Sequence, residues 1–199
     1  MKRLLLITLV AMANLCIVSC DTTHYNDPTI KIESSYGDIY VELYPKKAPK
    51  TVAGFLKFVD AGYFKNTSFY RVLKKEDQPS NAFKTQLIQG GLWQVNYKKQ
   101  ISIPGIEHES TQQTGLSHTN GVISLARDTL GSASTEFFIC IGDDHVYDYG
   151  GEASNDGQGF AAFGMVVKGM AIVREINKRP DFDTEFKPPI EIYNIKRVK

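Results

Sequence analysis

Short runs in which apolar and polar residues alternate cover most of the chain from residue 29 onward. Residues 29–33 and 38–43 each place their large aliphatic side chains on one face, and the turn-like segment 34–37 lies between them. This pattern predicts a β-hairpin, because successive side chains of a strand point to opposite faces. Six further short, β-rich runs follow, at residues 68–73, 86–89, 121–126, 137–141, 160–167 and 190–198.

Two segments show helical periodicity instead. After Pro49, apolar residues recur at helical spacing up to about Gly62, at Val52, Phe55, Leu56 and Val59. Proline suits the first position of a helix, and this spacing gives one apolar face. Residues 170–178 repeat the pattern in a shorter form. Eight strands with two helices predict a mainly β fold, an antiparallel barrel or sandwich with helical plugs.

The first residues of the chain predict a targeting segment. Lys2 and Arg3 precede an apolar run that is too short for a comfortable membrane span and ends in Ser19-Cys20. This ending resembles a bacterial lipobox, in which the cysteine is lipidated and becomes the new N-terminus. We expect a lipoprotein signal peptide at 1–19, a lipidated Cys20 with a polar tether at 20–28, and one domain at 29–199. An uncleaved anchor helix and cleavage elsewhere are the alternatives.

This reading predicts a protein of the cell envelope, held by lipid to a membrane on its periplasmic side or at the cell surface. After cleavage, Cys140 is the only cysteine that carries no lipid, so no disulfide can form within the chain. Of the 199 residues, 23% are charged, and the formal net charge is +1. No basic run points to nucleic acid, and no coiled-coil pattern points to an oligomer, so we expect a monomer.

No common catalytic motif is present in the sequence. There is no G-x-S-x-G and no phosphate-binding loop, and His108-Glu109 lacks the second histidine of a zinc protease helix. We expect His108 and His118 to be ordinary loop histidines rather than metal ligands. The aspartates of residues 143–159 do not follow calcium-loop spacing and predict a solvated acidic loop.

Strand alternation suggests one shared groove. It places Phe69 with Arg71, Leu87 with Gln89, and Glu136 with Phe138, each pair on one side of its strand. If these sides face one groove, the groove combines a guanidinium, an amide and a carboxylate with apolar walls. The alternative is that Arg71 is a solvated strand residue paired with a nearby acid.

At these same positions the sequence resembles the cyclophilins. Four segments lie in the family's order: Phe69-Tyr70-Arg71-Val72 resembles F-H-R-V, 87–91 resembles M-I-Q-G-G, 121–126 resembles G-x-L-S-M-A, and 136–139 resembles Q-F-F-I. A fifth segment, 163–169, resembles F-G-x-V-x-x-G. The resemblance covers residues 30–199 and implies a closed eight-stranded antiparallel β-barrel capped by two α-helices.

The resemblance also implies an activity, the cis-trans isomerisation of peptidyl-prolyl bonds. It assigns catalysis to Arg71 and the proline pocket to Leu87, Phe138 and Tyr147. Further contacts with the substrate are implied for Gln89, Ala126, Glu136 and Phe160. No metal or cofactor is implied, because no bond breaks in the reaction. The expected partners are proline-containing peptides and unfolded or exported proteins.

Several residues depart from the family pattern. Glu136 replaces a common glutamine, and its charge either pairs with Arg71 and orients it or weakens its donation. Gln86 stands where an aromatic pocket wall is usual. Arg127 replaces a common asparagine, and Phe160 falls where many members have histidine. These changes leave open a rival function, a membrane-anchored proline-peptide binding module or chaperone with little turnover. A carrier of a small apolar ligand is disfavoured, because bulky strand residues fill the barrel.

Cyclosporin is expected to inhibit this protein only weakly. Val146 aligns with the tryptophan associated with cyclosporin binding, and the only tryptophan of the chain is Trp93. Titrating the drug against isomerase activity tests this expectation, and tight binding at nanomolar cyclosporin would refute it.

Overall fold

The computed structural model describes residues 27–198. The expected signal peptide, the expected lipidation site Cys20 and most of the expected tether lie outside the described residues. None of the helices within residues 27–198 combines the length and the apolar character that a membrane crossing requires.

Nine strands and five short or medium helical segments make up the described part of the chain. The strands are β1 (Thr29–Ser34), β2 (Gly37–Leu43), β3 (Thr67–Leu73), β4 (Leu87–Gly91), β5 (Val122–Leu125), β6 (Phe137–Cys140), β7 (Ala161–Lys168), β8 (Asp181–Phe182) and β9 (Glu185–Arg197). The helices are α1 (Pro49–Asp60), α2 (Tyr97–Gln100), α3 (Thr111–Thr114), a 3₁₀ turn (His145–Tyr147) and α4 (Met170–Asn177).

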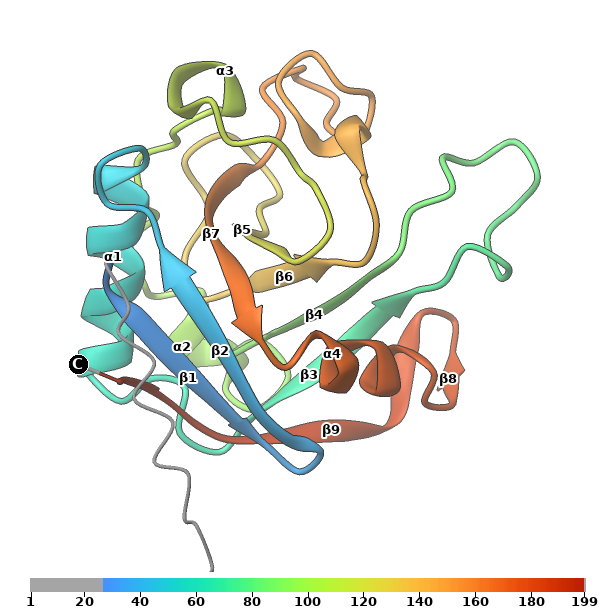
Figure 1. The fold of residues 1–199 in the computed structure, drawn as a ribbon, viewed down its shortest axis with the longest axis horizontal. Helices are drawn as coiled ribbons and strands as arrows, with labels where there is room; N and C mark the ends of the chain where they lie inside the picture. The colour runs from blue at the N-terminus through green and yellow to red at the C-terminus, as the bar shows by residue number, and fades with distance from the viewer. Residues whose placement is uncertain (1–26, 199) are drawn as a thin grey trace, which may run out of the picture.

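The strands form one antiparallel sheet that closes on itself (Figure 1). Its order is β1-β2-β7-β5-β6-β4-β3-β9-β8, and β1 also pairs with β9. Eight strands therefore close the barrel, while the two-residue β8 only extends the end of β9. The predicted eight-stranded antiparallel barrel is confirmed. Closure removes the exposed edges that an open sheet would present.

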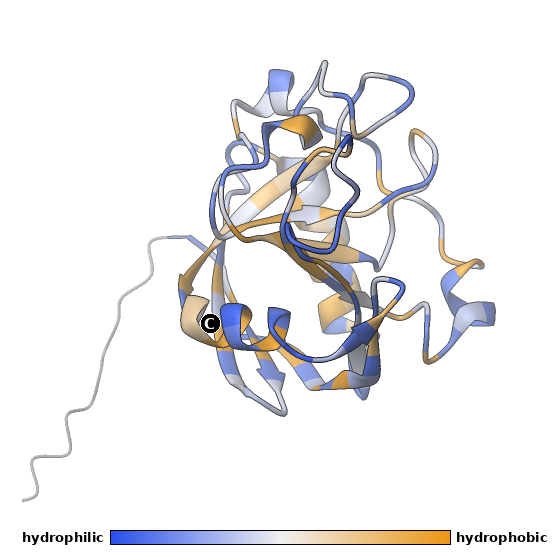
Figure 2. Ribbon diagram, turned by 90° about the vertical axis from the view of Figure 1, so that its right-hand side faces the viewer, coloured by the Kyte–Doolittle hydropathy of each residue, from blue (hydrophilic) through white to orange (hydrophobic). Residues whose placement is uncertain are grey.

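Inward-pointing side chains from every barrel strand fill the interior. Fully buried residues include Ile30, Ile39, Ile88, Ile123 and Ile192. Figure 2 looks into the ring of strands, along which hydrophobic colour is frequent, whereas the loops above them mix hydrophilic and hydrophobic residues. A packed core of this kind agrees with the expectation that the barrel is not a hollow carrier.

The two predicted helices are present and cover the barrel. Helix α1 begins at Pro49 and buries one apolar face. The ring of Phe55 lies 5.0 Å from that of Phe64 and 4.9 Å from that of Phe163. Helix α4 packs against β2 and β4 through Val173 and Ile176. Figure 1 shows α1 and α4 at different sides of the barrel. The single-turn helices α2 and α3 were not predicted, because one turn is too short to show a periodic pattern.

The alternation predicted for β3 is wrong at Phe69 and Arg71. The register of β3 shifts between these two residues on both sides, against β4 and against β9. Such a bulge inserts one extra residue into the strand and reverses the sides that follow it. Phe69 therefore lies in the barrel core, whereas Tyr70 and Arg71 both line a pocket outside it.

Candidate active site

A pocket of about 840 Å³ lies on the outside of the barrel, against β3, β4 and β6. It brings together eight residues that the sequence singled out: Arg71, Leu87, Gln89, Ala126, Glu136, Phe138, Tyr147 and Phe160. The paired register explains their proximity, because Arg71 lies opposite Gln89 on β4, and Gln89 lies opposite Phe138 on β6. Three neighbouring strands thus present one polar and apolar surface.

Arg71 is an exposed residue at the polar side of this surface. Its Nη1 donates to Oε1 of Gln89 at 3.4 Å. This hydrogen bond is long and therefore weak. It orients the guanidinium and occupies only one of its five N–H groups. Among the described residues, the other N–H groups of the guanidinium have no hydrogen-bond partner, so they are available to a ligand in the pocket.

A buried hydrogen-bond chain holds Gln89 in turn. The Nε2 of Gln89 donates to the Tyr70 hydroxyl at 2.8 Å, and that hydroxyl donates to Oε2 of Glu136 at 2.7 Å. Burial raises the pKa of Tyr70 far above its ordinary value, and the neighbouring Glu136 carboxylate adds to this shift. The phenol is therefore neutral and keeps the proton that it donates. The chain Glu136–Tyr70–Gln89 fixes the amide that contacts Arg71.

Glu136 is the anchor of this chain and of the loop that follows β4. Its Oε1 accepts the backbone N–H groups of Leu92 at 2.8 Å and Trp93 at 3.0 Å, and the Thr135 hydroxyl at 3.0 Å. Burial raises the pKa of Glu136, and these hydrogen bonds oppose the rise. Within residues 27–198, Glu136 forms no ion pair with Arg71. Its carboxylate acts on the arginine only through Tyr70 and Gln89.

Replacing Tyr70 with phenylalanine is expected to lower kcat/KM for a proline peptide about fivefold to tenfold. The change removes both hydrogen bonds of the hydroxyl and frees the Gln89 amide. We expect the loss of transition-state stabilisation to be about 1–1.4 kcal/mol, the net value of one hydrogen bond. Tyr63→Phe is the control, because that hydroxyl lies outside the pocket and has no hydrogen bond among those of the described residues. Equal activities of the Tyr70→Phe variant and the wild type would mean that the chain does not position Arg71.

The apolar side of the pocket is formed by Leu87, Phe138 and Tyr147, which belong with Cys140 to one cluster of buried residues. The Phe138 ring lies 5.2 Å from the Tyr147 ring and 5.6 Å from the Phe160 ring. The Tyr147 hydroxyl donates to Oγ1 of Thr85 at 2.9 Å, and burial raises its pKa to about 12. These neutral rings form an apolar slot in the same pocket as the guanidinium. Such a slot suits an apolar ring that is bound next to a polar backbone.

A histidine supports this slot from behind. His118 is 0% exposed, and its ring stacks on Phe138 at 5.8 Å with an interplanar angle of 11°. Its Nδ1 lies 2.6 Å from Oδ1 of Asp148, and its Nε2 lies 2.9 Å from Oγ of Ser124. Burial lowers the pKa of His118, so the neutral ring donates to Asp148 and accepts from Ser124. His118 lies in a loop, as expected, but it is fully buried, and both of its ring nitrogens have hydrogen-bond partners.

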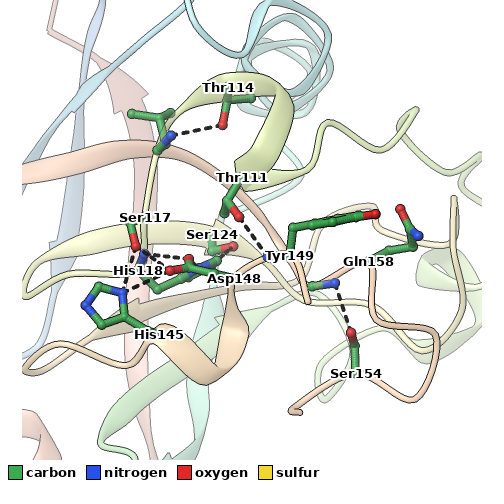
Figure 3. Close-up of polar contacts among 12 residues, drawn as sticks. Thr111, Thr114, Ser117, His118, Ser124, His145, Asp148, Tyr149, Ser154 and Gln158 are labelled. Atoms are coloured by element: carbon green, nitrogen blue, oxygen red, sulfur yellow. Dashed lines mark hydrogen bonds and ion pairs between the residues drawn. The ribbon is translucent and has the colours of Figure 1, made fainter. Parts of the chain in front are cut away.

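Asp148 connects this histidine to the surface (Figure 3). One carboxylate oxygen accepts the His118 backbone N–H at 2.9 Å, and the other contacts Ser117 and lies 2.9 Å from Nδ1 of His145. Hydrogen bonds from His118, Ser117 and His145 outweigh burial and hold the pKa of Asp148 well below its ordinary value. Nothing in the local sequence signals this arrangement, because its parts lie some 30 residues apart.

The acidic segment 143–159 is more ordered than predicted. Asp144 is buried, Asp148 holds His118, and Asp156 receives both Nη1 and Nη2 of Arg127 at 2.7 Å. The guanidinium of Arg127 also donates to the Gly159 carbonyl and lies 5.4 Å from the Phe160 ring. The prediction of a solvated acidic loop is therefore wrong in part: paired acids fix the loop against the pocket.

Residues 29–197 match the family model of the cyclophilin-type peptidyl-prolyl cis-trans isomerases. The chain belongs to this family. It is therefore an enzyme, an isomerase of peptidyl-prolyl bonds. Peptidyl-prolyl cis-trans isomerase B of Escherichia coli is 33% identical over 148 residues, which are 74% of this chain and 82% of that protein. Peptidyl-prolyl cis-trans isomerase A of Dickeya dadantii is 29% identical over 179 residues, which are 89% of this chain and 86% of that protein.

Solved cyclophilin structures share the fold. A cyclophilin-type isomerase of Cryptosporidium parvum superposes with a TM-score of 0.67 at 20% identity, covering 86% of this chain and 98% of that one. A second structure of that isomerase, in the presence of the dipeptide Ala-Pro, gives a TM-score of 0.66 at 21% identity, over 86% of this chain and 99% of that one.

In this cyclophilin, Gln86 does not form the polar pocket wall that its position suggested. Its Nε2 donates to Oδ1 of Asn177 on α4 at 2.6 Å, which directs the side chain away from the pocket. Phe83, which lies in the loop between β3 and β4, lines the pocket. Although Gln86 departs from the family pattern, the pocket still has an aromatic side chain in this part of the chain, that of Phe83, three residues earlier.

Proposed function

We propose that this cyclophilin accelerates X–Pro rotation in exported polypeptides during folding, with Arg71 as its catalytic residue. The observation that carries the proposal is that the Arg71 side chain lines the same pocket as Leu87 and Phe138. A proline ring in the slot of Phe138, Leu87 and Tyr147 would lie in the same pocket as the guanidinium.

Amide resonance explains what the guanidinium would do. The X–Pro bond prefers trans only slightly, but resonance keeps it planar, and rotation faces a barrier near 20 kcal/mol. In the twisted transition state the nitrogen becomes pyramidal and gains a lone pair. An N–H donated to that lone pair stabilises only the twisted form and so lowers the barrier. Arginine suits this role because its charge persists and its planar fork holds a fixed direction.

The placement of Gln86 and Glu136 favours turnover over mere binding. These two departures were the features that suggested a binding module with little turnover. Gln86 points to α4, and Glu136 is engaged by Tyr70 and the backbone of Leu92 and Trp93. Neither side chain therefore contacts Arg71 or neutralises its charge directly. The binding module remains the second candidate, since it needs only the slot.

A proline-isomerisation assay on a short Ala-X-Pro-Phe peptide tests the proposal. The wild-type protein is expected to speed the approach to cis-trans equilibrium well beyond the uncatalysed rate, which takes tens of seconds or longer. If it binds the peptide without any acceleration, the binding-module function replaces the enzymatic one for this pocket.

The expected lipid anchor, which would hold the exported protein at a membrane, depends on Cys20. Replacing Cys20 with alanine is expected to move the protein from the membrane fraction to the soluble envelope fraction. Each buried CH₂ of an acyl chain contributes about 0.8 kcal/mol, so several chains hold a small domain firmly. Metabolic labelling with a radioactive fatty acid, followed by fractionation, measures both effects, with Cys140→Ala as the control. Equal labelling of the Cys20→Ala variant would place the lipid elsewhere.

A further inference from the structure

A second arginine, Arg127, lines the pocket together with Arg71, but its surroundings differ. The side chain of Arg127 is only 2% exposed, whereas Arg71 is an exposed residue. A guanidinium is costly to bury unless other groups of the protein pair with it. The groups that pair with Arg127 therefore indicate what this side chain does.

Two partners engage most donors of the Arg127 guanidinium. Nη1 and Nη2 donate to the two carboxylate oxygens of Asp156, each at 2.7 Å. Nε and Nη2 donate to the carbonyl oxygen of Gly159 at 2.9 and 2.7 Å. A bidentate pair of arginine and carboxylate fixes a geometry as well as adding energy. We call Arg127, Asp156 and Gly159 the loop clamp.

The loop clamp ends directly beside Phe160, which follows Gly159 in the chain. The guanidinium carbon of Arg127 lies 5.4 Å from the centroid of the Phe160 ring. The same ring meets Phe138 at 5.6 Å and Tyr147 at 5.5 Å, both edge to face. Cation–π and edge-to-face contacts both favour particular orientations of a ring. Phe160 is therefore in contact with the clamp and with the proline slot at once.

Phe160 needs a restraint of this kind because phenylalanine has no polar atom. A histidine, which many cyclophilins have at this position, can be fixed by hydrogen bonds from its ring nitrogens. Arg127 in turn stands where an asparagine is common, and an asparagine has only two N–H donors in its side chain. Arginine instead donates to the carbonyl that precedes Phe160 and places a cation near its ring. The two departures from the family pattern thus complement each other.

We propose that Arg127 is a positioning residue, which acts through Asp156 and Gly159 to hold Phe160 as a fixed wall of the proline slot. The inference rests on the proposed function, because it concerns the slot in which the substrate proline would bind. A wall that is ordered in advance spares the substrate the entropic cost of ordering it. Because the wall contacts the proline ring and not the rotating bond, the clamp lowers KM and leaves kcat unchanged.

Replacing Arg127 with asparagine, the common residue of the family, tests this role. The variant is expected to raise KM for an Ala-X-Pro-Phe peptide about fivefold to tenfold, while kcat stays within twofold of the wild type. The Kd of the dipeptide Ala-Pro, measured by NMR titration, is expected to rise by a similar factor. An unchanged KM and Kd would overturn the proposal, because asparagine would then serve as well as arginine.

Arg197→Asn is the matched control. Arg197 also forms a bidentate pair, with Asp60 at 2.7 and 2.6 Å, but it lies outside the pocket. Its loss is expected to leave KM and kcat at their wild-type values. An equal rise of KM in the Arg197→Asn variant would overturn the proposal, since any lost ion pair would then have the same effect.

Asp156→Asn tests the clamp from its other side. Asp156 is 37% exposed, so this variant is expected to fold even where Arg127→Asn does not. It is expected to raise KM about twofold to threefold, because an amide has one oxygen acceptor for the fork of Arg127. If the two residues act as one unit, the double variant has the KM of Arg127→Asn alone. Independent, multiplying effects would overturn the clamp.

The outcomes distinguish this inference from the proposed function. Normal turnover with equal KM values in the wild type and the Arg127→Asn variant overturns the clamp and leaves the isomerase standing. If the wild type binds Ala-Pro but accelerates no peptide, the isomerase is contradicted. Weaker binding of Ala-Pro by the Arg127→Asn variant then still supports the clamp, and equal binding overturns it. A wild type that neither binds Ala-Pro nor turns over any peptide overturns both.

Discussion

Replacing Arg71 with alanine is expected to lower kcat/KM for a proline peptide about 10²–10³-fold. This is the effect of removing one donor aimed at a developing transition-state charge, about 2.7–4 kcal/mol. The loss should fall on kcat more than on KM, because the guanidinium acts on the twisted bond while the apolar slot grips the proline. A coupled isomerisation assay at several peptide concentrations gives both constants.

The fold should not suffer from this change. Arg71 is exposed, and within residues 27–198 its side chain makes a single hydrogen bond, to Gln89, which is 3.4 Å long. We expect the free energy of unfolding to change by no more than about 0.5 kcal/mol, the usual range for surface substitutions. Arg174→Ala is the matched control, since this exposed arginine lies on α4 outside the pocket. Wild-type turnover by the Arg71→Ala variant would show that another group stabilises the twisted bond.

The barrel was predictable because its signals are local. Each of its strands appears as a short alternating or apolar run, and α1 and α4 appear as helical repeats that begin at Pro49 and Met170. The closing pair β1–β9 was supplied by the resemblance rather than by the pattern, since it joins the two ends of the domain. Strand β9 begins at Glu185, five residues before the predicted run. The prediction missed these first residues because they lack a regular apolar alternation.

Only the part of the pocket formed by the residues of the family motifs was predictable from the sequence. Strand partners bring Arg71, Gln89 and Phe138 together as expected, but the bulge at Tyr70 reverses the sides of β3 and cannot be read from alternation. The contact between Tyr70 and Glu136 joins residues 66 positions apart. Phe83 lines the pocket from the loop between β3 and β4, and its placement depends on tertiary contacts rather than on propensity.

The His118–Asp148 pair shows the same limit. Sequence composition makes a loop histidine and an acidic loop look solvent-exposed, since these residues are usually at the surface. Their burial follows from mutual hydrogen bonding, which lets polar groups enter the interior at little cost. A pocket floor supported in this way depends on Asp148, although this side chain never reaches the pocket itself.

Replacing Asp148 with alanine is therefore expected to lower the free energy of unfolding by about 2–4 kcal/mol. The change leaves the His118 backbone N–H and its ring N–H without an acceptor in the interior, and each unsatisfied buried donor costs about 1–3 kcal/mol. His118 stacks on Phe138, so the slot should also loosen and KM should rise several-fold with little change in kcat. Urea unfolding and peptide kinetics at a temperature where the variant stays folded measure the two effects.

Two further variants separate the carboxylate's hydrogen bonding from its charge. Asp148→Asn keeps one oxygen acceptor for His118. We therefore expect its loss of unfolding free energy to be no more than half of the loss in Asp148→Ala. Asp143→Ala removes a charge from the same loop but loses only one acceptor, that of the Asn120 backbone N–H at 3.1 Å. We expect it to cost less than about 1 kcal/mol and to leave KM unchanged. Equal losses in the Asp143→Ala and Asp148→Ala variants would mean that the loop charge, and not the support of His118, stabilises this side of the pocket.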